Sequence, residues 1–294
     1  MSGRLIHTGQ VVVDLVMRVP NLPVPGGDVM ASTVDFVPGG GFNVMAAAAR
    51  AGAPVLYAGT HGTANFADLA RSAMAAEGIV LAHEPMGEGD TGIVVALVED
   101  DGERSFITGA GAEGRLSRGL LDGIAPTGQD VVYLTGYSLL HAPNAEALLD
   151  WLPRIGDATV LFDPGPLAGD VPGQVLAAVL SHVDILSCNA REAKAMDLES
   201  GRVETLVVRD GPAGCRVVVG ERVVSVPGFA VDAVDTNGAG DAHCGVLAAE
   251  LIAGTSLLEA ARRANAAAAI AVTRRGPATA PIRAELDAFL GLAR

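Results

Sequence analysis

The chain has 294 residues, half of them hydrophobic and 18% charged, which is enough to bury the core of one large α/β domain. Its formal net charge of −14 argues against nucleic acid or an anionic membrane surface as a partner, because both bind clustered cations. Three cysteines without a CxxC spacing, no signal peptide and no uncharged apolar run of about 18 residues indicate a soluble, cytoplasmic protein.

Two pairs of β-branched segments near the start of the chain predict antiparallel hairpins. The first pair is Val11–Val19 with Val29–Val37, and the second is Gly92–Val98 with Arg104–Thr108. Asp100-Asp101-Gly102 supplies turn residues within the second pair. We expect the two hairpins, about residues 10–37 and 90–109, to form a small β-sheet that projects from the main domain as a lid.

The rest of the chain alternates short apolar runs with longer stretches rich in Ala and Leu. The runs typical of buried strands are Val55–Gly59, Val131–Leu134, Thr159–Phe162, Val183–Leu186 and Thr205–Val208. Helical spacing occurs in Phe42–Ala51, Asn65–Glu77, Asn144–Leu152, Gly173–Leu180, Ala239–Gly254 and Leu257–Thr273. This alternation implies parallel strands with helices on both faces. The sequence has no low-complexity linker, so we expect a single domain, residues 1–294, that carries the lid.

The strongest motif runs from Asp235 to Asp241 and opens a helix. The small residues Gly238, Ala239 and Gly240 leave backbone N–H groups uncovered at the helix start, where the helix dipole favours an anion. Asp241 lies beside that anion in the first turn, and repulsion between like charges excludes it as a phosphate ligand. It is suited instead to take a proton from a hydroxyl that attacks phosphorus. The alternative is an acidic residue that only favours the dipole, with glycines that serve the turn.

A second glycine-rich turn, Gly39-Gly40-Gly41-Phe42-Asn43, precedes another predicted helix. Glycines at positions 40 and 41 let a ligand approach the backbone, and the amide of Asn43 offers a donor and an acceptor to a hydroxyl-rich ligand. Taken alone, the pattern favours a plain helix-capping turn.

Asn189-Ala190-Arg191-Glu192 follows the predicted strand Val183–Leu186. The carboxyl ends of strands hold the ligands of α/β sheets. Asn189 and Glu192, three residues apart, face the same side of a starting helix and are candidates to hold Mg²⁺ through its waters. The alternative is a helix cap in which Glu192 is the third residue of the helix, and this role is compatible with binding Mg²⁺.

These segments resemble the signatures of the ribokinase-like (PfkB) carbohydrate kinases. Asp235–Asp241 matches the DTxGAGD signature, and Asn189–Glu192 is similar to the NxxE magnesium motif. Gly39–Asn43, together with Gly52 and Gly62, resembles the N-terminal signature of the family. Further matches are Gly9 and Asp14, which resemble an early GxxxxD, and Ala267–Gly276, which resembles the end of ribokinases. The matches occur in order over essentially the whole chain.

The resemblance implies an α/β fold with a Rossmann-type central sheet, helices on both of its faces and a small β-lid over the substrate. It implies an ATP-dependent phosphotransferase whose acceptor is a hydroxyl of a sugar or sugar-like molecule. We expect this hydroxyl to be a primary alcohol. Asp241 would be the catalytic base, and the amides of Gly238, Ala239 and Gly240 would stabilise charge on the transferred phosphate.

The resemblance also implies residues for each ligand. The substrate would contact Asp14, Asp28, Gly40, Gly41 and Asn43. The nucleotide would contact Asn189, Gly211, Gly214, Gly238 and Gly240. Asn189 and Glu192 would hold Mg²⁺. Many members of the family also use a monovalent cation such as K⁺, and Asp235, Gly276 and Thr279 lie at positions that resemble that site.

Some residues depart from the family pattern. Val12 stands where ribokinases usually have Asn, and Arg209-Asp210 stands where Thr-Leu is common in the nucleotide loop. The Gly-rich turn contains none of the lysine that ribokinases carry there; Lys194 is the only lysine in the sequence. These differences leave the chemistry intact but argue against ribose as the substrate. Val12 and Phe42 indicate a less polar or differently shaped one.

Other functions stay open. A nucleoside kinase would use aromatic partners near the lid, for which Phe36, Phe42 and Phe106 are candidates. A sugar- or nucleotide-binding regulator without activity would not need a base such as Asp241.

His243 lies two residues after Asp241 and has two interpretations: it contacts the substrate, or it packs against the sheet. The helix turns by about 200° between the two residues, which favours packing. An exposed lid edge predicts a homodimer through the lid.

Overall fold

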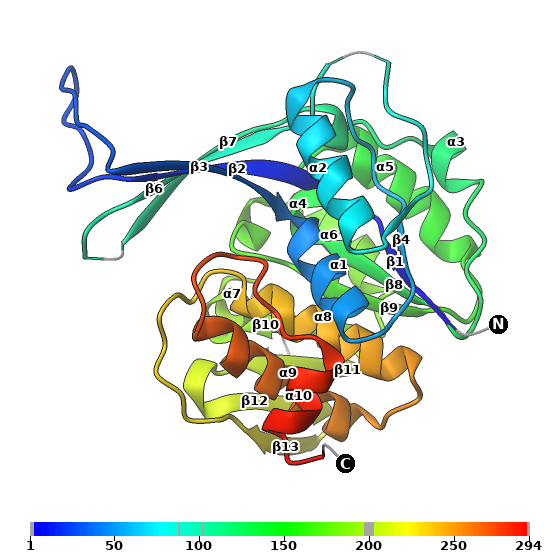
Figure 1. The fold of residues 1–294 in the computed structure, drawn as a ribbon. Helices are drawn as coiled ribbons and strands as arrows, with labels where there is room; N and C mark the ends of the chain where they lie inside the picture. The colour runs from blue at the N-terminus through cyan, green and yellow to red at the C-terminus, as the bar shows by residue number, and fades with distance from the viewer. Residues whose placement is uncertain (1–2, 88, 102, 197–202, 293–294) are drawn as a thin grey trace.

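The central sheet has nine strands within the residues that the structure describes. The structure is a computed structural model covering residues 3–87, 89–101, 103–196 and 203–292 (Figure 1). In spatial order the strands are β13 (Arg222–Pro227), β12 (Gly214–Val219), β11 (Thr205–Arg209), β10 (Ile185–Asn189), β9 (Thr159–Asp163), β8 (Val131–Thr135), β1 (Leu5–His7), β4 (Val55–Tyr57) and β5 (Val80–Leu81). From β5 to β11 neighbouring strands are parallel, as predicted, and β12 and β13 continue the sheet antiparallel.

The antiparallel edge is a departure from the predicted pattern. Strands β12 and β13 are joined by a tight turn at Gly220, whose φ of +57° favours glycine. Strands that follow each other so closely can pair only in antiparallel fashion. Strands β1 and β5 were not predicted, because they are too short to show a periodicity. Strand β10 begins later than predicted, at Ile185, and extends to Asn189.

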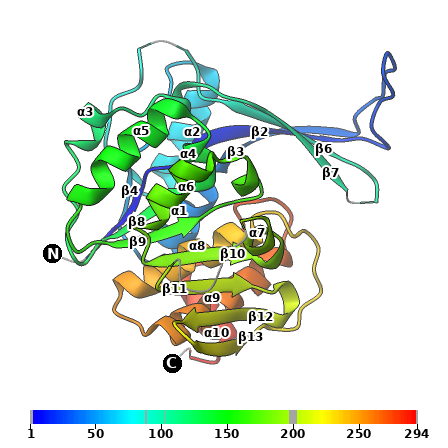
Figure 2. The same cartoon turned by 180° about the vertical axis from the view of Figure 1, so that it is seen from behind.

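Helices cover both faces of the central sheet, which confirms the predicted fold class (Figures 1 and 2). One face packs against α1 (Gly41–Arg50), α2 (Asn65–Ala76), α8 (Ala239–Ile252), α9 (Leu257–Val272) and α10 (Arg283–Phe289). The other face packs against α3 (Arg118–Leu121), α4 (Gly136–Leu139), α5 (Ala142–Trp151), α6 (Gly173–Leu180) and α7 (Ala190–Ala195). Alternate strand residues supply the two cores: Leu5 points to the first, and Ile6 to the second.

Short 3₁₀ turns connect several of these elements. They are η1 (Ala112–Gly114), η2 (Leu152–Arg154), η3 (Ala168–Asp170) and η4 (Gly211–Ala213). Among the described residues, no helix is both long enough and apolar enough to cross a membrane.

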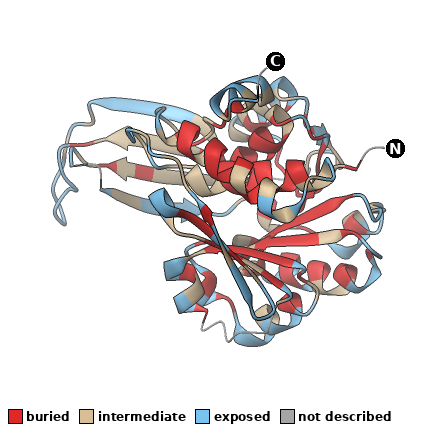
Figure 3. Cartoon of the chain, turned by 90° about the horizontal axis from the view of Figure 1, so that it is seen from below, coloured by how far each residue is buried: buried red, intermediate tan, exposed pale blue. Residues whose placement is uncertain are grey.

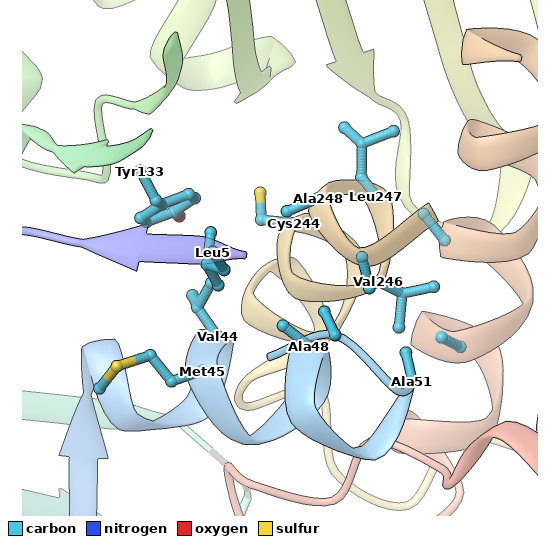
Figure 4. Close-up of a cluster of buried hydrophobic side chains, with 14 of the residues drawn as sticks. Leu5, Val44, Met45, Ala48, Ala51, Tyr133, Cys244, Val246, Leu247 and Ala248 are labelled. Carbon is cyan, nitrogen blue, oxygen red and sulfur yellow. The ribbon is translucent and has the colours of Figure 1, made fainter. Parts of the chain in front are cut away.

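Helix α8 is buried between α1, α9 and the sheet. Figure 4 shows Val44 and Ala48 on the side of α1 that faces α8. Gly245 of α8 permits this close approach, because a Cβ atom there would lie 2.3 Å from the carbonyl oxygen of Val44. The two helices therefore lie close enough for polar side chains near their first turns to meet.

A second sheet forms the lid, with the strand order β3-β2-β6-β7. Its strands are β2 (Val11–Arg18), β3 (Thr33–Gly40), β6 (Ile93–Val98) and β7 (Arg104–Gly109). Both predicted hairpins are antiparallel, and a parallel pairing of β2 with β6 joins them. Figure 3 shows the projecting lid mainly in the colours of intermediate and exposed residues.

Two details of the lid differ from the prediction or lie beyond it. Strand β3 begins at Thr33, not at Val29, and extends to Gly40. It starts later because Ser32 closes a loop onto strand β2, through a hydrogen bond of 2.8 Å from its N–H to the carbonyl oxygen of Arg18. Of the predicted turn Asp100-Asp101-Gly102, Gly102 lies outside the described residues.

Candidate active site

The first turn of α8 carries the amides predicted to bind phosphate. Gly238 precedes the helix with a φ of +75°, and a Cβ atom on it would lie 1.9 Å from the carbonyl oxygen of Pro277. Only glycine therefore fits here. Among the described residues, the N–H groups of Gly238 and Gly240 have no protein acceptor, whereas the N–H of Ala239 donates to Thr236 at 3.4 Å. Two of the three predicted amides are thus free to bind an anion, and the third is engaged in a long hydrogen bond.

Asp241 and Asn43 meet across the α1–α8 contact. The side-chain N–H of Asn43 donates to Oδ2 of Asp241 at 3.0 Å. Oδ1 of Asn43 is buried and has no partner among the described residues. A buried amide oxygen without a donor is a costly arrangement, so this atom is available to a ligand hydroxyl. The contact holds Asp241 in place and leaves a polar atom beside it.

Two carboxylates share this region. Burial raises the pKa of Asp241 to about 6, with Asp163 adding to the effect, although the hydrogen bond from Asn43 opposes it. Burial likewise raises the pKa of Asp14 to about 6, and the negative charge of Asp241 contributes. Both carboxylates are ionised at neutral pH but hold a proton more readily than free carboxylates do. Asp241 is thus suited to accept a proton at neutral pH.

Asp14 belongs to one face of the lid. Residues paired across neighbouring strands point to the same side, so the register places Asp14, Arg18, Arg104 and Phe106 on a single face. This face is turned toward the segment before α8, because Arg104 on it forms an ion pair with Asp235. The close approach of β3 behind Asp14 requires glycine, since a Cβ on Gly39 would lie 2.4 Å from Oδ2 of Asp14.

Other residues predicted for the substrate lie elsewhere or serve the fold. Asp28 is exposed in the loop between β2 and β3, and the structure does not bring it to Asp14 or Asp241. Phe42 is buried in the core under α1 and so is not a lid aromatic. Gly40 has a φ of +60°, and a Cβ on Gly41 would lie 2.2 Å from Cε1 of His7. These two glycines are explained by the packing of the β3–α1 turn, as the pattern alone favoured.

Asn189 and Glu192 form a capping box at the start of α7. Oδ1 of Asn189 accepts from the N–H of Glu192 at 2.9 Å, and Oε2 of Glu192 accepts from the N–H of Asn189 at 2.7 Å. The same Oε2 accepts from Arg209 at 3.2 Å. Burial and the charge of Asp163 nevertheless raise the pKa of Glu192 above its ordinary value. The capping interpretation holds, and the capping box and Arg209 both use Oε2 of Glu192, not Oε1.

Arg209 ties two strands and two helices together at the carboxyl edge of the sheet. From the end of β11 its Nη1 donates to Asp163 at the end of β9 at 2.7 Å, and to Sγ of Cys244 in α8 at 2.9 Å. A Cβ on Gly240 would lie 3.4 Å from the same nitrogen. The guanidinium therefore lies directly under the turn that is predicted to bind phosphate. The sequence-based prediction included Arg209 only as a departure from the family pattern and did not include Asp163, although the two residues end parallel strands on either side of β10.

Gly211 and Gly214 differ in what surrounds them. Both have positive φ values, +58° and +97°. A Cβ on Gly211 would meet no atom within 4 Å, whereas one on Gly214 would lie 2.2 Å from the carbonyl oxygen of Val226. Gly211 therefore borders open space, and Gly214 is required by the packing of β12 against β13.

Asp235, predicted as part of a monovalent cation site, is occupied by N–H donors. Its Oδ1 accepts from the N–H of Asn237 at 3.0 Å and from Nη2 of Arg104, and its Oδ2 accepts from the N–H of Gly276 at 3.1 Å. Burial by itself would raise the pKa of Asp235, but these donors hold it below its ordinary value. The hydroxyl of Thr279 lies 3.1 Å from the carbonyl oxygen of Ala271 and 3.3 Å from that of Gly276, and no hydrogen bond joins it to Asp235.

His243 is a core residue. It is buried, and burial lowers its pKa to about 3, so the ring is neutral at physiological pH. This agrees with the packing interpretation of the sequence.

Comparison with known proteins identifies the family. A model of the pfkB family carbohydrate kinases matches residues 3–284. The chain belongs to the PfkB family of carbohydrate kinases. The resemblance seen in the motifs is thereby confirmed, and with it the prediction of a kinase.

Relatives of this PfkB kinase span nearly its whole length. It is 31% identical over 316 residues to the Escherichia coli K12 protein named uncharacterized sugar kinase YegV, with 97% of this chain and 98% of that one covered. It is 31% identical over 302 residues to an ATP-dependent ribose-1-phosphate kinase of Halopiger xanaduensis, with 98% of each covered.

Solved structures show the same architecture. A ribokinase from Thermotoga maritima superposes with a TM-score of 0.82 at 25% identity, covering 98% of this chain and 99% of that one. A nucleoside kinase from Methanocaldococcus jannaschii has a TM-score of 0.82 at 18% identity, with 99% of each covered, which is a likeness of fold alone.

Proposed function

We propose that this PfkB kinase transfers the γ-phosphoryl group of ATP to a primary hydroxyl of a sugar or sugar-like molecule, with Asp241 as the base. The observation that carries the proposal is the position of the Asp241 carboxylate. It lies in the first turn of α8, between the free amides of Gly238 and Gly240 and the lid carboxylate of Asp14.

The substrate hydroxyl would bind between Asp241 and Asn43. Asp241 accepts its proton as the oxygen attacks the γ-phosphorus in line. The pKa of Asp241, raised to about 6, supports this role because the carboxylate is charged at neutral pH yet basic enough to accept a proton. The unpartnered Oδ1 of Asn43 accepts a hydrogen bond from a second hydroxyl of the substrate.

Charge that develops on the phosphoryl group would be stabilised by the start of α8. The N–H groups of Gly238 and Gly240 point away from protein acceptors, and the positive end of the helix dipole lies behind them. Arg209 adds a positive charge under the same turn. The nucleotide would extend from here past Gly211, where the structure leaves open space.

Mg²⁺ would be held by Glu192 together with the phosphates. In the described part of the chain no cluster of three His, Cys, Asp or Glu side chains forms a complete metal site. Mg²⁺ usually takes one or two carboxylates, several waters and substrate phosphates, so a single available carboxylate fits it. Asp163, Glu192 and Arg209 together leave one negative charge in excess, which also favours a cation. The ion would neutralise charge between the phosphates. Asn189 would contribute mainly by fixing Glu192.

A nucleoside remains the second candidate substrate. Phe106 supports it, because this side chain is 56% exposed and lies on the same lid face as Asp14. An aromatic ring there would stack on a base or cover the apolar face of a sugar. Phe36 lies on the opposite face and stacks on Phe66 of α2, so it does not serve this purpose.

We also propose a cytoplasmic homodimer formed through the lid. The edge strands β3 and β7 have no further partner strand among the described residues. The face of the lid opposite Asp14 exposes Val34, Phe36 and Ile107, which are apolar. Uncovered strand edges and apolar faces favour association with a second copy. Sedimentation of the purified protein would give a monomer if this proposal were wrong.

An ATP-consumption screen tests the main proposal. The panel should contain pentoses, hexoses, sugar acids, sugar phosphates and nucleosides, with product identified by mass spectrometry. We expect one class to be phosphorylated and the activity to require Mg²⁺. If no member of the panel is phosphorylated and no ATP is consumed, the result would instead support a binding protein that has lost the transferase function.

A further inference from the structure

We propose that Arg104 is a positioning residue that couples the lid to the phosphate-binding turn through Asp235 and supplies the positive charge that a monovalent cation would otherwise bring. The inference rests on the proposed function, since its purpose is to order that turn for phosphoryl transfer.

The contact joins two parts of the molecule that are remote in sequence. Arg104 begins β7 at one end of the lid, and Asp235 opens the segment that leads to Gly238 and α8. The ion pair is largely shielded from solvent, because Arg104 is 25% and Asp235 12% exposed. Charge-assisted hydrogen bonds of this kind are stronger than neutral ones. Arg104 is thus a direct physical connection between the lid and the anion-binding segment.

Asp235 in turn organises the backbone around the turn. Its carboxylate accepts from the N–H of Asn237, the residue before Gly238, and from the N–H of Gly276. Gly276 precedes Pro277, whose carbonyl oxygen packs against the Cα of Gly238. Both sides of the phosphate-binding turn therefore depend on one carboxylate, and the position of that carboxylate depends on Arg104.

With Arg104 in place, Asp235 does not fit a bound monovalent cation. Such an ion needs oxygen ligands, but Oδ1 of Asp235 faces the guanidinium of Arg104. A second cation beside the guanidinium would be repelled. The positive charge is instead that of the Arg104 side chain, which belongs to the lid. It therefore lies beside Asp235 when the lid lies over the site.

The register of the lid supports this arrangement. Arg104 and Arg18 lie opposite the same residue, Val98, on the face that carries Asp14. Arg18 also lowers the pKa of Asp235 through its charge, but no hydrogen bond joins the two. Arg18 is therefore a matched control, an arginine on the same face that affects Asp235 only through space.

The experiment compares Arg104→Met, Arg104→Lys and Arg18→Met with the wild-type protein in two readouts. The first is amide hydrogen exchange, without ligands, in peptides that contain Asn237 and Gly276. We expect faster exchange in Arg104→Met, because the carboxylate that accepts from these amides loses its anchor. Arg18→Met should resemble the wild type, and Arg104→Lys should lie between.

The second readout is the rate of phosphoryl transfer in KCl and in choline chloride at equal ionic strength. We expect equal wild-type rates in the two salts, and an Arg104→Met rate about tenfold lower in choline chloride that recovers in KCl. A wild-type enzyme that needs K⁺, or unchanged exchange in Arg104→Met, would overturn the inference. If no substrate is phosphorylated at all, the exchange data still decide the coupling, so failure of the proposed function is recognised separately.

Discussion

The backbone at the start of α8 packs so closely on its neighbours that Gly238 and Gly245 have no room for a side chain. The lid, by contrast, is joined to the candidate active site by a few polar side chains. Gly238 packs on Pro277 and Gly245 on Val44, so the position of Asp241 is determined before any ligand binds. The lid reaches the same site through Asp14 and Arg104. We therefore expect changes at α8 to lower kcat and changes at Asp14, the lid residue that would contact the substrate, to act mainly on KM.

Removing the base should have the largest effect. In Asp241→Asn the amide cannot accept the substrate proton, so kcat should fall by about 10²–10⁴. The hydrogen bond from Asn43 has an acceptor in the variant, so the fold should remain. Steady-state kinetics with the substrate found by screening measure the loss. Turnover near the wild-type value would show that the carboxylate is not the base.

Gly238→Ala tests whether the immobile turn binds the phosphoryl group. The new methyl would collide with Pro277 and displace the free amides, and losing such donors lowers kcat by about 10²–10³. Gly254→Ala is the control, because Gly254 has a similar φ of +79° but open space around it. Both variants carry backbone strain. Equal kcat in the two would refute a special role for the turn.

Asp14→Asn tests the lid half of the comparison. A hydrogen bond from a substrate hydroxyl to a charged group contributes about 1.5–3 kcal/mol, so KM for the acceptor should rise about 10- to 100-fold. The value of kcat should change less, because Asp14 does not touch the phosphoryl group in the proposed arrangement. Asp28→Asn tests the sequence-based prediction that Asp28 binds the substrate. Because Asp28 lies in an exposed loop, we expect KM to be unchanged, and a rise comparable to that of Asp14→Asn would support the prediction.

The pH profile reports the two carboxylates together. Asp241 must be deprotonated to act, and its pKa and that of Asp14 are raised to about 6. The value of kcat/KM should therefore be level above pH 7 and fall at least tenfold per unit below pH 6, because protonation of Asp14 also weakens substrate binding. Samples returned to pH 7.5 after each measurement check that the protein stayed folded. Full activity at pH 4.5 would contradict the raised pKa values.

The smallest expected effect is a gain in stability. Because the pKa of Asp241 is raised from 3.8 to about 6, the folded state binds a proton more tightly than the unfolded state. Its stabilising contribution is full below pH 3.8 and is lost as the pH rises through about 6. At pH 7.5 the neutral Asp241→Asn should thus be more stable, by about 1 kcal/mol or 2–4 °C in Tm. Calorimetry showing a lower Tm would mean that the charge is well solvated.

Long periodic segments and glycine-rich turns could be predicted because their causes are local. The alternation of strand and helix, the hairpins of the lid and the turn before Asp241 follow from residue spacing and from glycine backbone freedom. Short elements such as β1 and β5 could not, since two or three residues show no period. Strands β12 and β13 were missed, although their valine-rich runs on either side of Gly220 carry a local hairpin signal.

The sequence by itself determined the family, the fold class and the residue at the centre of the proposed chemistry, because ordered motifs over the whole chain record them. Only the tertiary structure decided which charges meet. Arg209 of β11 pairs with Asp163 of β9, on the other side of β10. Arg104 contacts Asp235, 131 residues further along the chain, and Asp28 lies in an exposed loop. Such pairings depend on distances in the folded molecule, and spacing along the chain carries no record of them.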